Sequence, residues 1–155
     1  MPKIMAGHGV KPKYKRSTAG FGFNTEAVKK TLLEGRELLH QRYSENKNGT
    51  ALLCDHCRLV DGILRRVWRE MAMPDRIALL AVGGYGRRQL FPYSDIDLLV
   101  LLPGLENGDD AADSPIEFQL EQWVRSLWDM GLEVGHSVRT LAECAEEAGK
   151  DITVQ

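Results

Sequence analysis

Residues 82–102, VGGYGRRQLFPYSDIDLLVLL, constrain the fold of this chain more than any other segment. A short apolar run ends in paired glycines, and after a polar loop a second apolar run begins at Ile96 and contains Asp97. Side chains alternate between the two faces of a strand, so Asp95 and Asp97 leave the same face, with about 7 Å between their Cα atoms. The segment therefore predicts a strand, a glycine-rich loop and a second strand that carries two carboxylates on one side.

The paired carboxylates of Asp95 and Asp97 indicate a metal site. Two carboxylates this close repel each other unless they are protonated or share a cation. Oxygen ligands on a rigid strand suit magnesium, which is typically held by one or two protein carboxylates, by waters and by substrate phosphates. The alternative is a pair of surface aspartates on an edge strand, alternating with the buried residues Ile96 and Leu98. On spacing alone, the two interpretations are evenly matched.

The loop before the aspartates favours the metal site. Gly83 and Gly84 remove side chains where the chain leaves the first strand, which lets backbone amides approach a phosphate closely. Arg87 places a positive charge beside them, and the hydroxyl of Ser94 is able to hydrogen-bond to a phosphate. A glycine loop, an arginine, a serine and paired aspartates in one short segment predict a site for a triphosphate and a metal ion.

The periodicity of apolar residues elsewhere predicts a chain of mixed helices and strands. The expected elements are helices over 25–46 and 51–72, a buried strand over 76–82, a strand over 96–103, a surface loop over 104–115, a helix over 115–130, a strand over 132–138 and a last helix. Thr140 and Glu143 have the spacing of a capping box at the start of that last helix. The order of elements indicates an α/β fold preceded by two helices.

Charge and hydropathy exclude several classes of function. A net charge of −2 over 155 residues gives no sign of binding to nucleic acid or to an anionic membrane. The longest apolar run, near 96–102, is too short to span a bilayer. The basic N-terminus lacks the apolar core of a signal peptide. We therefore expect a cytoplasmic protein with reduced thiols.

The sequence CDHC at 54–57 is similar to half of a zinc site, to which His56 would add another ligand. No second CxxC or HxxxH follows in the sequence to complete four ligands. The stretch also lies within a strongly helical pattern, so small buried thiols are the favoured interpretation.

Two segments carry a resemblance to a known family. GGYGRRQLFPYSDIDLLVLL resembles the signature of the nucleotidyltransferase superfamily with the polymerase-beta-like fold. Together with LWDMGLEVGHSVRTLAEC, it resembles the bifunctional uridylyltransferase/uridylyl-removing enzymes of nitrogen regulation. The resemblance implies an α/β core with a mixed sheet over 74–155, incomplete at its C-terminus. It would follow a disordered or loose tail over 1–24 and a helical segment over 25–73.

The resemblance implies roles for four residues of the opening segment. Gly83 and Gly84 would bind the nucleoside triphosphate, and Asp95 and Asp97 would hold the catalytic magnesium ion. The family pattern has Glu where this chain has Gln89, which affects a supporting contact and not the metal site.

A third carboxylate from a later strand would activate the acceptor hydroxyl. Glu133 is the candidate for this role, and Asp151 is its rival. His136 and Arg139 lie in the second matching segment without an assigned chemistry.

The activity implied is transfer of UMP from UTP to a tyrosine hydroxyl of the PII signal protein, with release of pyrophosphate. One alternative is a related nucleotidyltransferase with another acceptor, such as an adenylyltransferase or an antibiotic-modifying enzyme. Another is a nucleotide-binding regulatory module without turnover. The hydrolytic HD domain and the ligand-sensing domains of the family do not fit within 155 residues. Any activity of these residues is therefore expected to run only in the transferase direction.

Overall fold

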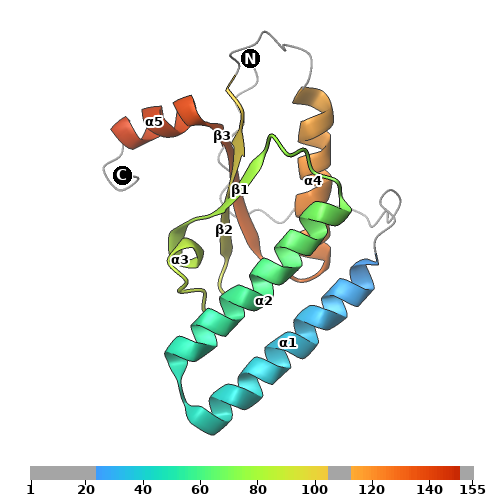
Figure 1. The fold of residues 1–155 in the computed structure, drawn as a ribbon, viewed down its shortest axis with the longest axis vertical. Coiled ribbons are helices and arrows are strands. Elements are labelled where there is room, and N and C mark those ends of the chain that lie inside the picture. The colour runs from blue at the N-terminus through green and yellow to red at the C-terminus, as the bar shows by residue number, and fades with distance from the viewer. Residues whose placement is uncertain (1–23, 105–112, 151–155) are drawn as a thin grey trace.

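A computed structural model describes residues 24–104 and 113–150, and Figure 1 shows its fold. Two helices, α1 (Thr25–Asn46) and α2 (Gly49–Glu70), lie side by side at the start of the described chain (Figure 1). Each begins at an asparagine whose side-chain oxygen accepts a backbone N–H of the first turn, Asn24 for α1 and Asn48 for α2. Both predicted helices are confirmed, and α2 ends two residues earlier than expected.

Three strands form one mixed sheet in the order β1–β2–β3. The strand β1 (Ala78–Ala81) is antiparallel to β2 (Ile96–Leu102), and β2 is parallel to β3 (Val134–Thr140). The helix α4 (Asp113–Asp129) joins the two parallel strands. The predicted α/β fold with a mixed sheet is confirmed, and β2 is its central strand.

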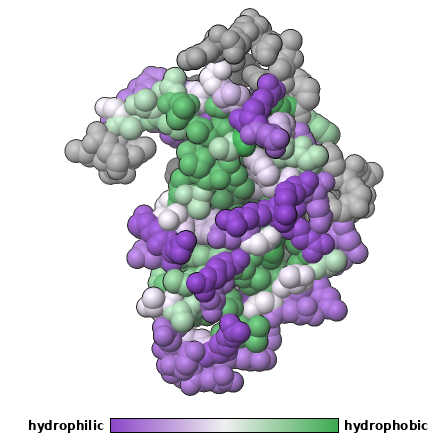
Figure 2. Space-filling model, viewed as in Figure 1, coloured by the Kyte–Doolittle hydropathy of each residue, from purple (hydrophilic) through white to green (hydrophobic). Residues whose placement is uncertain are grey.

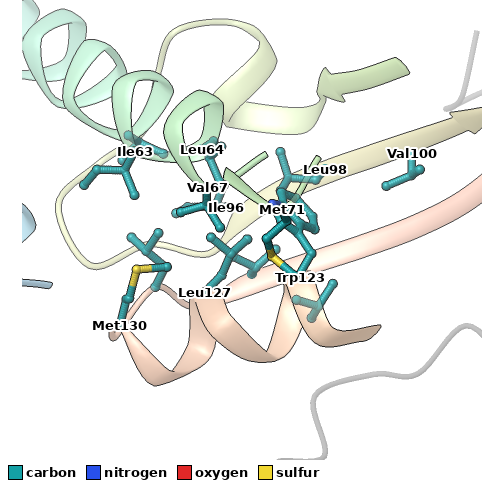
Figure 3. Packing of buried hydrophobic residues seen from close by; sticks show 14 of the residues in the cluster. Ile63, Leu64, Val67, Met71, Ile96, Leu98, Val100, Trp123, Leu127 and Met130 are labelled. Atoms are coloured by element: carbon teal, nitrogen blue, oxygen red, sulfur yellow. The ribbon is translucent and has the colours of Figure 1, made fainter. Parts of the chain in front are cut away.

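The hydrophobic core fills the space between one face of the sheet and the helices α2 and α4 (Figure 3). Every second residue of β2 enters this core: Ile96 and Leu98 are 2% exposed and Val100 is 0% exposed. The rings of Trp68 and Trp123 meet edge to face between the two helices, with centroids 5.1 Å apart. The helical segment and the sheet therefore share a single core.

The opposite face of the sheet is less covered within the described residues. Leu80 of β1 is 39% exposed, and the helix α5 (Leu141–Lys150) buries none of its residues. Figure 2 shows apolar surface over the strands beside α5. The expected buried strand over 76–82 is thus wrong in its burial, because β1 is a four-residue edge strand that packs on one face only.

The remaining predicted elements have mixed outcomes. The capping box at α5 is confirmed: the Thr140 backbone N–H donates to the Glu143 carboxylate at 2.7 Å, and the Glu143 N–H donates to the Thr140 hydroxyl at 3.3 Å. Most of the expected loop over 104–115 lies outside the described residues, as do the predicted tail up to residue 23 and residues 151–155. Within 24–104 and 113–150, no helix is both long and apolar enough to cross a membrane.

Candidate functional site

Asp95 and Asp97 lie on the side of the sheet that faces away from the core. Both are exposed, whereas Ile96 and Leu98, which alternate with them, are buried. The strand that carries Asp97 is flanked by β1 on one side and by β3 on the other. The interpretation of the pair as surface aspartates on an edge strand is therefore wrong, because β2 is the central strand.

The carboxylate of Asp97 lies in a notch between two glycines. A Cβ atom built on Gly83 would lie 2.6 Å from Asp97 Oδ2, closer than real Cβ atoms approach an oxygen. On the other side, Gly135 is the β3 partner of Asp97, and a Cβ atom there would lie 3.3 Å from Asp97 Oδ1. Gly83 also has a φ of +59°, which favours glycine. Side chains are absent at both positions, which leaves room for this carboxylate.

Gly135 was not predicted as part of the site. A glycine inside a strand often marks a place where a ligand or another group approaches closely. That signal is present in the sequence VGH at 134–136. The backbone supports the same arrangement from the other side, since the Val82 N–H donates to the Asp97 carbonyl at 3.0 Å.

The glycine-rich segment forms a single helical turn, α3 (Gly83–Gly86), where a loop was expected. A Cβ atom on Gly86 would lie 2.7 Å from the Ala81 carbonyl oxygen, so this glycine allows the turn to pack on β1. A Cβ atom on Gly84 would lie 3.5 Å from the Gln89 carbonyl oxygen, which is an ordinary contact. Gly84 thus has no packing reason to be glycine, whereas Gly83 and Gly86 do.

Polar side chains of the loop form hydrogen bonds within the loop itself. Arg87 is exposed and its Nε donates to Gln89 Oε1 at 3.4 Å. The Ser94 hydroxyl donates to the Phe91 carbonyl at 2.8 Å, which closes the turn before Asp95. Gln89, the residue that departs from the family pattern, therefore supports Arg87 within the loop.

Glu133 lies next to Asp95 at the start of two parallel strands. Its backbone carbonyl accepts the Ile96 N–H at 2.8 Å, and the next residue, Val134, pairs with Ile96. Because Val134 is buried on the core side, Glu133 falls on the same face as the aspartates. Among residues 24–104 and 113–150, however, no three acidic, histidine or cysteine side chains gather closely enough to hold a metal ion. The rival Asp151 lies outside the described residues.

The structure does not bring His136 and Arg139 to the aspartates. His136 pairs with Leu98, so it belongs to the face opposite Asp97; its side chain is exposed overall, and partial desolvation of the ring lowers its pKa. Arg139 pairs with Leu101, four residues along β2 from Asp97.

Comparison with known families decides the assignment. Residues 63–148, which include α3, β2 and β3, match the family model of the nucleotidyltransferase domain. The chain belongs to the nucleotidyltransferase family.

The chain is also similar to bacterial enzymes that share one name. The chain is 65% identical over 133 residues, 86% of its length, to a bifunctional uridylyltransferase/uridylyl-removing enzyme of Nitrosospira multiformis. It is 47% identical over 115 residues to an enzyme of the same name from Burkholderia orbicola, and 46% identical over 130 residues to one from Pseudomonas entomophila. These matches cover 74% and 83% of the chain, which spans only 13–15% of the three relatives. No solved structure matches the chain.

Two buried side chains link the segment between β1 and β2 to α2, and neither contact was predicted. Tyr85, which stands between Gly84 and Gly86, is 5% exposed, and its hydroxyl donates to the Asp61 carboxylate. Burial first, and then the hydrogen bond and the charge of Asp61, raise the pKa of Tyr85 far above its usual value.

The second link is made by His56, which is 1% exposed with its Nδ1 3.1 Å from the Leu90 carbonyl oxygen. Burial lowers the pKa of His56, the hydrogen bond to Leu90 opposes this shift, and the charge of Arg36 adds to it. The CDHC stretch therefore supplies a structural histidine beside the buried thiol of Cys57. The sequence favours buried thiols over a zinc site in this stretch, but nothing in it indicates the contact between His56 and Leu90.

Proposed function

We propose that this domain transfers UMP from UTP to a tyrosine hydroxyl of the PII signal protein, with release of pyrophosphate. The observation that carries the proposal is the Asp97 carboxylate, which lies between Gly83 and Gly135 on the solvent-facing side of the central strand. The word uridylyltransferase in the names of three relatives supports UTP as the donor. The acceptor rests on the resemblance to enzymes of nitrogen regulation.

The donor set fits a magnesium ion. Asp95 and Asp97 present only oxygen atoms and are exposed to an approaching triphosphate; Asp97 lies in the central strand of the sheet and Asp95 immediately before it. Asp95 and Asp97 would hold the ion, which would neutralise negative charge on the triphosphate.

The chain's own residues would position the reactants. The exposed guanidinium of Arg87 would pair with the phosphates, with Ser94 and the backbone at Gly83 and Gly84 beside it. The tyrosine oxygen of the acceptor would attack the α-phosphorus in line, and its proton would pass to the Glu133 carboxylate. A bond forms between that oxygen and phosphorus while the bond to the pyrophosphate oxygen breaks.

A second candidate is a nucleotide-binding module without turnover. The observation that favours it is the lack of a gathered third carboxylate within the described part of the chain, since Glu133 does not complete a metal cluster with the aspartates. The module would bind UTP and magnesium as the enzyme does and would differ only in transferring nothing.

The test is a labelling experiment on the protein that contains this chain. It would be incubated with magnesium, PII and UTP or ATP labelled at the α-phosphate, beside PII whose tyrosines have been replaced by phenylalanine. The proposal expects label from UTP on PII and none on the phenylalanine form. Label from ATP alone would identify an adenylyltransferase, and UTP binding without any label would identify the module without turnover.

A further inference from the structure

The loop that joins β1 to β2 is held from outside by the two N-terminal helices. From α2, Asp61 accepts the Tyr85 hydroxyl and His56 contacts the Leu90 carbonyl at 3.1 Å. From α1, the guanidinium carbon of Arg36 lies 5.4 Å from the centre of the Tyr93 ring. These contacts fall near the start, the middle and the end of the loop; the first two are buried, whereas Tyr93 is exposed.

The loop itself is strained and needs such support. Arg88 has a φ of 59° and Tyr93 a φ of 69°, in the left-handed region that residues other than glycine rarely adopt. Such conformations cost free energy and persist only where the surrounding structure determines them. Two buried polar contacts hold the loop in this conformation. One is made by Tyr85, before the two strained residues, and the other by Leu90, between them.

The contact of His56 has a defined direction. A carbonyl oxygen only accepts hydrogen bonds, so the imidazole must carry its proton on Nδ1 and donate it to Leu90. The other ring nitrogen, Nε2, is buried and has no hydrogen-bond partner among the described residues. A neutral histidine with one proton is therefore the form that this site accepts, and its single polar contact is the one to the loop.

The contact of Tyr85 is charge-assisted, because the acceptor is a carboxylate. Tyr85 lies within the glycine turn itself, one residue from Gly84 and two from Gly83. The α3 turn also lies against Asp97, because a Cβ atom on Gly83 would be only 2.6 Å from Asp97 Oδ2. A displacement of Tyr85 would therefore change the distance between the glycine turn and the Asp97 carboxylate.

We propose that His56 and Asp61 of α2 are positioning residues for nucleotidyl transfer, and that they act by holding the glycine turn through Leu90 and Tyr85. This inference rests on the function proposed above. The helix α2 would then not only pack against the sheet but also support the transfer site. Misplacement of reacting groups by about 1 Å lowers rates by about 100-fold in enzymes, so loss of a contact is expected to affect turnover.

The test compares four variants in the protein that contains this chain: Tyr85→Phe, His56→Leu, His56→Asn and Val67→Ala. Val67 of α2 is 0% exposed and belongs to the hydrophobic core, so its variant controls for lost stability. For each variant, kcat and KM for UTP would be measured with magnesium and PII at a temperature where all variants are folded. UTP affinity would be measured by titration, and Tm by circular dichroism.

The two substitutions of His56 separate positioning from packing. Asparagine keeps an N–H donor near the position of Nδ1 but fills less of the buried site, whereas leucine fills the site and cannot donate. The proposal expects kcat/KM to fall by about 10- to 100-fold in His56→Leu and Tyr85→Phe, and to recover in part in His56→Asn. Val67→Ala should lower Tm and leave kcat and KM unchanged.

Loss of activity that follows Tm alone, with leucine retaining more activity than asparagine, would overturn the inference and leave the proposed function intact. If the wild-type protein binds UTP without transferring UMP, the UTP affinities test the inference instead. They should then be weakest in His56→Leu and Tyr85→Phe and recover in part in His56→Asn. A wild-type protein that neither binds UTP nor transfers UMP would contradict the proposed function and this inference with it.

Discussion

The two faces of the central strand β2 differ in burial and in the kind of side chain they carry. On one face, Ile96, Leu98 and Val100 are at most 2% exposed and pack against α2 and α4. On the other, Asp97 is exposed, as is Asp95 immediately before the strand, and glycines stand where neighbouring side chains would otherwise touch Asp97. One seven-residue strand thus serves stability through alternate residues and the candidate chemistry through the others. Substitutions on the two faces should accordingly have different consequences.

The largest expected effect on stability lies on the core face. Leu98→Ala should lower the free energy of unfolding by about 2–5 kcal/mol, because it leaves a cavity in a closely packed core. Chemical denaturation followed by circular dichroism measures this change. The activity per folded molecule should remain close to that of the wild type. A large fall in the activity of folded protein would show that the two faces are not independent.

The largest expected effect on activity without a comparable loss of core packing lies at the notch. Gly83→Ala places a methyl group where only 2.6 Å separates it from Asp97 Oδ2, and the φ of +59° disfavours alanine. We expect transfer to fall by about 100-fold or more, from displacement of the carboxylate or the turn. Gly131→Ala is the matched control, since Gly131 also has a positive φ of +85° but a Cβ atom there would meet nothing within 4 Å. Equal transfer rates in Gly83→Ala and the wild type would show that transfer does not depend on the space between Gly83 and Asp97.

A smaller effect should depend on pH through His56. Its pKa is lowered in the folded protein, chiefly by burial, while the unfolded value is about 6.5. Below that value the unfolded chain binds a proton that the folded chain does not, so stability should fall as the pH falls through 6.5 towards the folded pKa. His136, also with a lowered pKa, should contribute in the same direction.

Urea denaturation at pH 7.5 and pH 5.5 tests this dependence. The loss of stability between the two conditions should be smaller in His56→Asn than in the wild type, and smaller again when His136 is also replaced by asparagine. The same loss in all three proteins would mean that other groups cause the acid sensitivity.

The smallest effect is expected for an apolar residue on the open side of the sheet. Leu80 is 39% exposed on the edge strand, and threonine suits a strand equally well, so Leu80→Thr should change the free energy of unfolding by about 1 kcal/mol or less. Thermal denaturation beside Leu98→Ala gives the contrast between the faces directly. A loss as large as that of Leu98→Ala would indicate that Leu80 is covered by another part of the protein.

Much of the fold follows from local patterns in the sequence. The apolar spacing of α1, α2 and α4 and the capping residues Thr140 and Glu143 are signals that a few neighbouring residues carry. The alternation of Asp95 and Asp97 with buried residues likewise predicted which face of β2 they occupy. These features depend on the periods of helices and strands, and the tertiary structure does not change them.

The features that sequence reasoning missed depend on contacts between distant segments. The burial of β1 was overestimated because the edge position of a strand is set by which strands pair with it. The role of Gly135 depends on a register that places it beside Asp97, and that of His56 on a contact with Leu90 in another part of the chain. The roles of Glu133 and the metal ligands remain predictions for the transfer experiments to decide.

The role of Asp97 is tested by the rate of UMP transfer from UTP to PII in the Asp97→Asn variant, measured with magnesium beside Asp75→Asn. Asp75 is an exposed aspartate before β1, so its variant controls for the loss of one surface charge. Asparagine preserves the shape of the side chain and removes the charge that would hold the metal ion. We expect Asp97→Asn to lose transfer while its circular dichroism spectrum and Tm match those of the wild type, and Asp75→Asn to retain transfer. Undiminished transfer by a folded Asp97→Asn protein would contradict the central claim.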